Sequence, residues 1–216
     1  ALTLNTEFST SAEIFTSLHK SVITNAATSA TWWDFAISSY HNGSAVQHAS
    51  GSIAIHPRNA ALQSKYKPPS GALESTAKRT WYEKFIRQGL NYGPTFQTIS
   101  EFYTPRMKSE SFASATAPLL KTSGDSISVY PVHPIALDGM IQLAVVAATN
   151  GKPKELRAQI PTRLPSAIVH TSTSSNQTCQ MHAVVKRIGF GYTHAGIEMI
   201  DSDGQIVAQF DDIRLS

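Results

Sequence analysis

The sequence predicts an α+β fold in which antiparallel strands surround one buried helix. The helix is expected at residues 134–149 (PIALDGMIQLAVVAAT), where apolar side chains cover nearly the whole circumference. Segments that alternate polar and apolar residues lie before and after it, as strands of a half-buried antiparallel sheet do. A helix without a polar face needs cover on all sides, and such a sheet can supply it.

Composition argues against several classes of protein. With 41% hydrophobic residues the 216-residue chain is ordinary for a soluble protein, and it has no apolar run long enough for a membrane span. The net charge is +3, but lysines and arginines are scattered and not interleaved with aromatics, which argues against nucleic-acid binding. Cys179 is the only cysteine, so no intrachain disulfide is possible, and we expect a cytoplasmic protein with neither a nucleic-acid nor a membrane partner.

Residues 1–56 are predicted to form a small hairpin-rich unit. Within it, residues 32–39 and 45–55 have the composition of strands, and the YHNG segment between them supplies a turn. Residues 57–75 have weak periodicity and contain the run PPSG, which indicates a linker. The main domain then covers residues 76–216.

This main domain is expected to begin with a helix at residues 76–88. Trp81, Tyr82 and Phe85 would lie on one face of it, and Gly89 can end it. Besides the central helix, five strands are expected, at residues 95–103, 109–117, 180–188, 192–200 and 206–215.

Asp138 and Gln142 are the polar exceptions in the apolar helix. Their spacing of four residues places them on one face, one turn apart. A carboxylate without partners would be costly there, so Asp138 is either a structural residue satisfied by Gln142 or backbone donors, or a functional one. In the functional case, burial raises the carboxyl pKa, and the group can stay protonated near neutral pH and act as a general acid.

Two motifs carry a resemblance to a known family. Residues 132–142 (VHPIALDGMIQ) and, upstream, residues 90–97 (LNYGPTFQ) resemble the HPxxLDxxxQ and YGPxFQ signatures of polyketide synthase dehydratase domains, in particular those of reducing iterative synthases. Residues 159–165 (QIPTRLP) are similar to a strand segment that follows in those domains, and residues 32–55 to the closing hairpin of their first half. The resemblance therefore covers nearly the whole chain.

The family implies a double hot-dog fold, two units in each of which an antiparallel sheet wraps around a central helix. Residues 1–56 would be the remainder of an incomplete N-terminal hot-dog, and residues 76–216 the C-terminal one. The implied reaction removes water from a β-hydroxyacyl thioester, whose acyl chain is carried on the phosphopantetheine arm of an acyl carrier protein. No metal or redox cofactor is implied, and the partners would be the carrier protein, other synthase domains and, in a homodimer, a second copy.

The resemblance also implies roles for residues of the two motifs. Asp138 would protonate the departing hydroxyl, and Gln142 would orient the carboxyl. Tyr92 would hydrogen-bond the hydroxyl or Asp138, although a tyrosine at this place can equally just pack. Two further residues, His133 and Pro134, would set the entry to the helix, and His133 could instead contact the acid.

Three more residues complete the expected site. Gly93 and Pro94 would shape a turn beside it, and Phe96 would form its wall or belong to the core. The family's base is a histidine in an HxxxGxxxxP motif, which no histidine of this chain matches. His48 comes nearest, but its glycine is one residue early and it lies on a predicted strand. The base is therefore expected in an N-terminal segment before residue 1, and this chain alone is expected to be inactive.

Two other functions stay open. One is a catalytically inactive dehydratase-like scaffold within a synthase. The other is a product-template-type domain that guides cyclisation of a polyketide, which also uses a histidine and an aspartate. The YGP triplet at Tyr92 and the glutamine at position 142 favour dehydration over cyclisation, because product-template domains tend to differ at both places.

Overall fold

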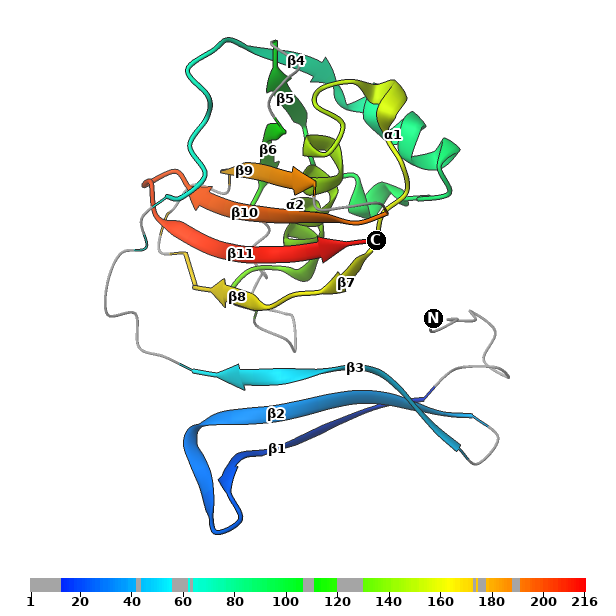
Figure 1. Ribbon diagram of the computed structural model, residues 1–216. Coiled ribbons are helices and arrows are strands. Elements are labelled where there is room, and N and C mark those ends of the chain that lie inside the picture. Colours follow the sequence, from blue (N-terminus) through cyan, green and yellow to red (C-terminus); the bar gives the residue numbers. More distant parts are fainter. Residues whose placement is uncertain are drawn as a thin grey trace. The chain divides into compact units, whose positions relative to one another are not determined.

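The computed structural model describes residues 13–41, 44–55, 62, 64–106, 111–119, 130–172, 174, 178–187 and 191–216. The chain divides into a first unit, Ala1–Asn59, and a second unit, Ala60–Ser216 (Figure 1).

The first unit is a three-stranded antiparallel meander. Its strands are β1 (Ile14–Thr24), β2 (Ala27–His41) and β3 (Ser44–Ala54), in the order β1-β2-β3. The sequence predicts β2 and β3 but misses β1. In β1 the aliphatic residues of one face recur every fourth position, and this weakens the alternation expected of a strand.

The meander has one apolar and one polar face. Cross-strand partners share a face, so the register gathers Leu18, Phe35 and other apolar side chains on one side. On the opposite side Asp34 accepts hydrogen bonds from Ser21 and Ser52, both at 2.7 Å. Large side chains of the apolar face remain exposed, and no helix occurs among the described residues of this unit to cover them. That this unit is the remainder of an incomplete first hot-dog stays a prediction.

The second unit is built on one antiparallel sheet. The strand order is β4-β5-β6-β9-β10-β11-β7, and β8 also pairs with β11. Four of the five predicted strands have the expected extents within a few residues, and the fifth is shorter. The strands are β4 (Leu73–Ala77), β5 (Glu101–Pro105), β6 (Phe112–Pro118), β7 (Pro161–Arg163), β8 (Ser166–Val169), β9 (Thr178–Arg187), β10 (Thr193–Asp201) and β11 (Ile206–Leu215).

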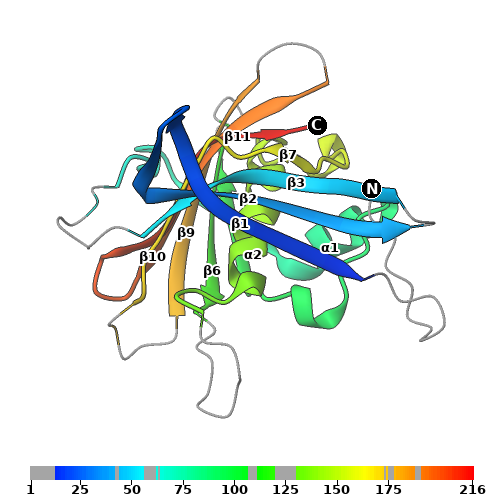
Figure 2. The same ribbon diagram turned by 90° about the horizontal axis from the view of Figure 1, so that it is seen from below.

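The central helix α2 (Pro134–Ala147) packs on β6, β9 and β10 (Figure 2). Pro134 occupies the first helical position, where its missing N–H costs nothing. The prediction of a helix covered by strands is confirmed. Its burial on every side is a correction: residues 142–149 are buried, whereas Leu137, Asp138 and Ile141 in the first turns are only partly buried.

Helix α1 (Lys78–Arg87) buries Trp81, Tyr82 and Phe85, as predicted. The chain leaves it through Gly89, whose φ of +87° favours glycine. Two other boundaries differ from the prediction. Strand β4 begins within the expected linker, because a five-residue strand gives little sequence signal and is specified by its pairing with β5. Residues 95–100 are not a strand, since Pro94 starts the short helix η2 (Pro94–Phe96).

A buried carboxylate ties the segment before β4 to the face of the sheet opposite α2. Glu198 on β10 is 0% exposed and accepts hydrogen bonds from the backbone N–H of Lys65 at 3.0 Å and from the hydroxyl of Ser64. His182 Nδ1 lies 3.3 Å from Glu198 Oε1. Burial alone would raise the pKa of Glu198, but these hydrogen bonds outweigh it and the pKa is lowered. Residues of the expected linker are thus an integral part of the second unit.

Among the residues that the structure describes, no helix has the length and apolar character needed to cross a membrane.

Candidate active site

The predicted site residues meet where the first turns of α2 approach η2 and α1. Gln142 is the centre of this arrangement and is 0% exposed. Its Nε2 donates to Asp138 Oδ2 at 2.7 Å and to the backbone carbonyl of Phe96 at 3.0 Å. Its Oε1 accepts from the hydroxyl of Tyr82 at 2.8 Å. Both amide protons and the carbonyl oxygen are therefore in use.

The neighbours fix which way the Gln142 amide faces. The carbonyl of Phe96 can only accept, so it must face the amide nitrogen. The backbone N–H of Ile99 donates to the Tyr82 hydroxyl, which leaves the phenolic proton for Gln142 Oε1. Gln142 can then offer only an N–H to Asp138. Among the described residues, one carboxyl oxygen of Asp138, Oδ2, is thus engaged, and Oδ1 accepts no hydrogen bond.

The surroundings of Asp138 favour its neutral form. Burial raises its pKa, and the hydrogen bond from Gln142 opposes this effect only in part. Burial and the nearby charge of Asp138 raise the pKa of Tyr92 to about 12, and burial also raises that of Tyr82. Both phenols therefore stay neutral near pH 7, and Asp138 is the titratable group that chemistry at this place would use.

Tyr92 contributes mainly through its ring and backbone. The ring stacks edge-on against Phe85 at 5.3 Å and Tyr82 at 6.3 Å, while its carbonyl accepts from Gln97 Nε2 at 2.8 Å. The packing role that the sequence offered as the alternative for Tyr92 is thus present in the structure. A role of its hydroxyl toward Asp138 or a substrate stays a prediction.

The Gly-Pro-Thr-Phe turn positions the Phe96 carbonyl. The backbone N–H of Phe96 donates to the carbonyl of Gly93 at 2.9 Å, which closes η2 over Pro94. Gly93 has a φ of −66°, and a Cβ there would meet no atom within 4 Å, so the second unit itself does not demand glycine. The Phe96 side chain is 42% exposed and lies outside the core.

His133 caps the helix that carries Asp138. Its Nδ1 accepts from the backbone N–H of Ile135 at 3.2 Å, so Nε2 carries the proton of the neutral ring. The ring stacks edge-on with Tyr130 at 5.7 Å. Together with Pro134 it sets the entry to α2, the first of the two roles expected for it.

His48 lies in β3 of the first unit, on a strand as predicted. Its Nε2 is 2.7 Å from Ser39 Oγ, next to a register irregularity between β2 and β3. In the second unit, His182 and His194 contact the carboxylates of Glu198 and Asp212. Within the described residues, no cluster of three or more His, Cys, Asp or Glu side chains could hold a metal ion.

The role of Tyr82 was not predicted from the sequence. Tyr82 was expected only on the apolar face of α1, whereas its hydroxyl holds the amide of Gln142. A signal was present, because a buried tyrosine usually directs its hydroxyl to a polar partner. The contribution of the Phe96 carbonyl could not be read from a side chain at all.

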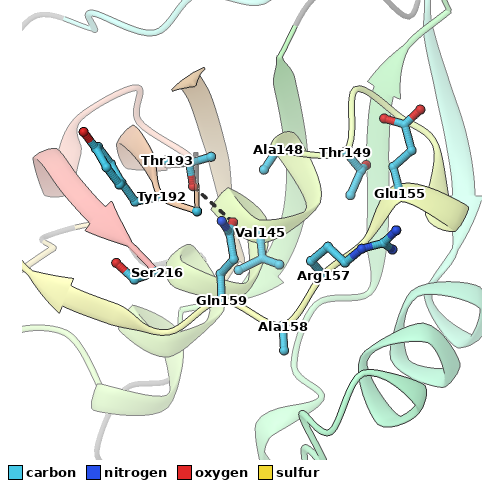
Figure 3. A pocket seen from close by; sticks show the side chains of 11 residues that line it. Val145, Ala148, Thr149, Glu155, Arg157, Ala158, Gln159, Tyr192, Thr193 and Ser216 are labelled. Carbon is cyan, nitrogen blue, oxygen red and sulfur yellow. Dashed lines mark hydrogen bonds between the residues drawn. The ribbon is translucent and has the colours of Figure 1, made fainter. Parts of the chain in front are cut away.

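A cavity of about 590 Å³ lies at the other end of α2, and Asp138 does not line it (Figure 3). Val145 in the last turn of α2 and Ala148 and Thr149 just after the helix form part of its wall, and Arg157 and Tyr192 are among the other residues that line it (Figure 3). A narrow apolar tunnel at Asp138, which the sequence led us to expect, stays a prediction.

The antiparallel sheet around α2 is a hot-dog fold, as predicted. The dehydratase domain of RzxB from Pseudomonas fluorescens has a similar structure, with a TM-score of 0.70 and 16% sequence identity over 92% of this chain and 67% of that one. At that identity the likeness shows the fold.

Family membership rests on sequence. Residues 60–216 match the model of the polyketide synthase dehydratase N-terminal domain, and the chain belongs to this family. The highly reducing polyketide synthase srdA of Neurospora crassa is 33% identical over 218 residues, 99% of this chain and 9% of that protein. The highly reducing polyketide synthase fogA of Aspergillus ruber is 30% identical over 213 residues, 94% of this chain and 9% of that protein. The chain thus spans less than a tenth of the curated relatives it matches.

Proposed function

We propose that the chain is part of a dehydratase domain that removes water from a β-hydroxyacyl group within a larger polyketide synthase. The observation that carries the proposal is the Asp138 carboxyl, whose pKa burial raises and whose Oδ2 is held by Gln142. A carboxyl group that holds its proton more tightly than usual and is fixed at one oxygen has the properties of a general acid.

In the proposed reaction, Asp138 gives its Oδ1 proton to the β-hydroxyl. The bond between the β-carbon and oxygen breaks, and the oxygen leaves with the bonding electrons as water. A base takes the proton of the α-carbon, and the electron pair of that C–H bond forms the new double bond to the β-carbon. The product is an α,β-unsaturated thioester, and the steps balance without an oxidant, a metal or a redox cofactor.

We propose that the base is a histidine outside this chain, from a segment that would complete the first hot-dog. In support, none of the chain's histidines fits the family motif, and the chain spans only 67% of the RzxB dehydratase domain. The substrate would be carried on the phosphopantetheine of an acyl carrier protein, and the other synthase domains would be the remaining partners. Assignment of residues 76–216 to the second hot-dog belongs to the same proposal.

The test is Asp138→Asn in a chain extended to include the histidine motif. The amide is nearly isosteric with the acid but a poor proton donor, so conversion of a β-hydroxyacyl carrier-protein substrate should fall about 10²–10⁴-fold. Mass spectrometry of the acyl group follows the loss of water. Asp203→Asn, in the exposed turn between β10 and β11, is the matched control and should keep normal turnover. Near-normal turnover of the Asp138 variant would remove this residue from the mechanism.

A further inference from the structure

Four basic side chains that are far apart in the sequence lie in one row on the sheet. The register pairs His194 of β10 with Lys186 of β9 on one side and with Arg214 of β11 on the other. Arg214 in turn pairs with Arg163 of β7. The four strands are neighbours in the sheet (Figure 1). Direct cross-strand partners share a face, so these four side chains form a continuous line, here called the basic row.

The basic row lies on the face of the sheet opposite α2. Its neighbours along the strands, Val185, Ala195 and Ile213, belong to the hydrophobic core, and successive side chains of a strand point to opposite faces. Lys186, Arg163 and Arg214 are exposed, and His194 is partly buried. The row is therefore a surface feature of the second unit.

The charges of the row are poorly compensated. Arg163 and Arg214 are directly opposite each other, an arrangement that costs stability because like charges repel. Among the described residues, no carboxylate lies within ion-pair distance of Lys186, Arg163 or Arg214, and Asp212 bonds only His194, at 2.7 Å. An unfavourable arrangement of this kind is expected where an anionic partner supplies the missing charge.

Arg214 is held in place before any partner arrives. Its guanidinium lies 4.3 Å from the centroid of the Tyr192 ring, which is also close to the His194 ring at 5.8 Å. Stacking uses the face of the guanidinium and leaves the N–H groups at its edge free to donate to a carboxylate. Less side-chain entropy is lost on binding to such a fixed arginine.

We propose that the basic row docks an acidic α-helix of a protein partner, which lies across strands β9, β10, β11 and β7. The spacing supports a helix. Neighbouring strands are about 4.8 Å apart, so the row is about 14 Å long. Carboxylates on one face of a helix recur at about 5.4 Å per turn, so three turns span about 16 Å, within about 2 Å of the length of the row. This surface is independent of the dehydration chemistry at Asp138.

The test measures binding of a capped, alanine-rich peptide with glutamates at positions i, i+4, i+7 and i+11 to the full 216-residue chain. A peptide of the same composition and helicity, with its glutamates spread around the circumference, is the ligand control. The one-faced peptide should bind more tightly, and its affinity should fall steeply with salt, because the screening length shrinks from about 10 Å at 0.1 M to about 3 Å at 1 M.

The double variant Arg163→Gln with Arg214→Gln should weaken binding of the one-faced peptide about fivefold, as two exposed ion pairs are lost. Lys67→Gln with Arg87→Gln removes the same charge from exposed positions outside the row and should change binding little. The double variant relieves the repulsion between Arg163 and Arg214 but also loses the contact of Arg214 with Tyr192, so its melting temperature is measured alongside binding to show that it remains folded at the assay temperature. Equal binding of both peptides, or equal losses in both variants, would overturn the proposal. Tighter binding of an oligonucleotide of the same charge would show that the partner is not a protein helix.

Discussion

Replacement of Gln142 by leucine tests the hydrogen-bond arrangement of the site most directly. The substitution keeps the volume nearly unchanged but removes every polar atom of a side chain that is 0% exposed. The Tyr82 hydroxyl loses its acceptor in the buried interior, and the Phe96 carbonyl loses a partly buried donor. A buried group left unsatisfied costs about 1–3 kcal/mol and a lost net hydrogen bond about 1 kcal/mol, so the second unit should lose about 2–4 kcal/mol.

Hydrogen exchange at the amides of α2 measures this loss without assuming that both units unfold together. A loss of that size should speed exchange through opening of the helix about 30-fold to 1000-fold. Gln88→Leu, at an exposed position just after α1, is the matched control and should change exchange little. If both variants exchange alike, the hydrogen bonds of Gln142 do not stabilise the helix in the way described.

Tyr82→Phe and Gln142→Leu together form a double-mutant cycle that is measured by the same hydrogen exchange. Tyr82→Phe removes the donor to Gln142 Oε1, and when it is combined with Gln142→Leu neither partner remains to be left unsatisfied. The double variant should therefore lose less than the sum of the two single losses. In Gln142→Leu the carboxyl pKa of Asp138, followed by carbon NMR, should also rise further, because the hydrogen bond that lowers it is gone. Additive losses and an unchanged pKa would refute the arrangement.

Three further predictions concern pH and completeness. The folded pKa of Asp138 is raised, so its contribution to stability is present at low pH and is lost as pH rises through the folded pKa. The variant Asp138→Asn should therefore melt at a higher temperature than the parent chain near pH 8, and the difference between the two melting temperatures should be smaller near pH 4. Glu198 has a lowered pKa, so its contribution to stability is present above the unfolded pKa and is lost as pH falls through the folded pKa. The variant Glu198→Gln should therefore show a weaker fall of the melting temperature at acid pH. A melting-temperature profile equal to that of the parent chain would contradict the role of the hydrogen bonds from Ser64 and Lys65 to Glu198. The chain by itself should convert a β-hydroxyacyl thioester little or not at all. It should gain activity when it is extended by a segment with the histidine motif, because general-base assistance raises a rate about 10²–10⁴-fold. Full activity without that segment would make His48 the candidate base.

The sequence by itself determined the centre of this protein. Proline at the first helical position and an apolar run of the right length define α2, and the spacing of four residues predicts that Asp138 and Gln142 share a face. These are local properties, which depend on residues less than two turns apart. For the same reason the strands with clear alternation were predicted well, whereas the short β4 and the η2 turn were not.

Tertiary structure alone decided how the site and the surface are assembled. Tyr82 precedes Gln142 by 60 residues, and the Phe96 carbonyl by 46, so no local pattern relates these groups. The lysines and arginines that look scattered in the sequence include three that align in the basic row, because strand register, not chain distance, sets which side chains are neighbours. Local spacing could predict that Asp138 and Gln142 lie on one face of a helix. Only tertiary packing brings Tyr82 and the Phe96 carbonyl to Gln142, and only strand register aligns the basic row on the opposite face of the sheet.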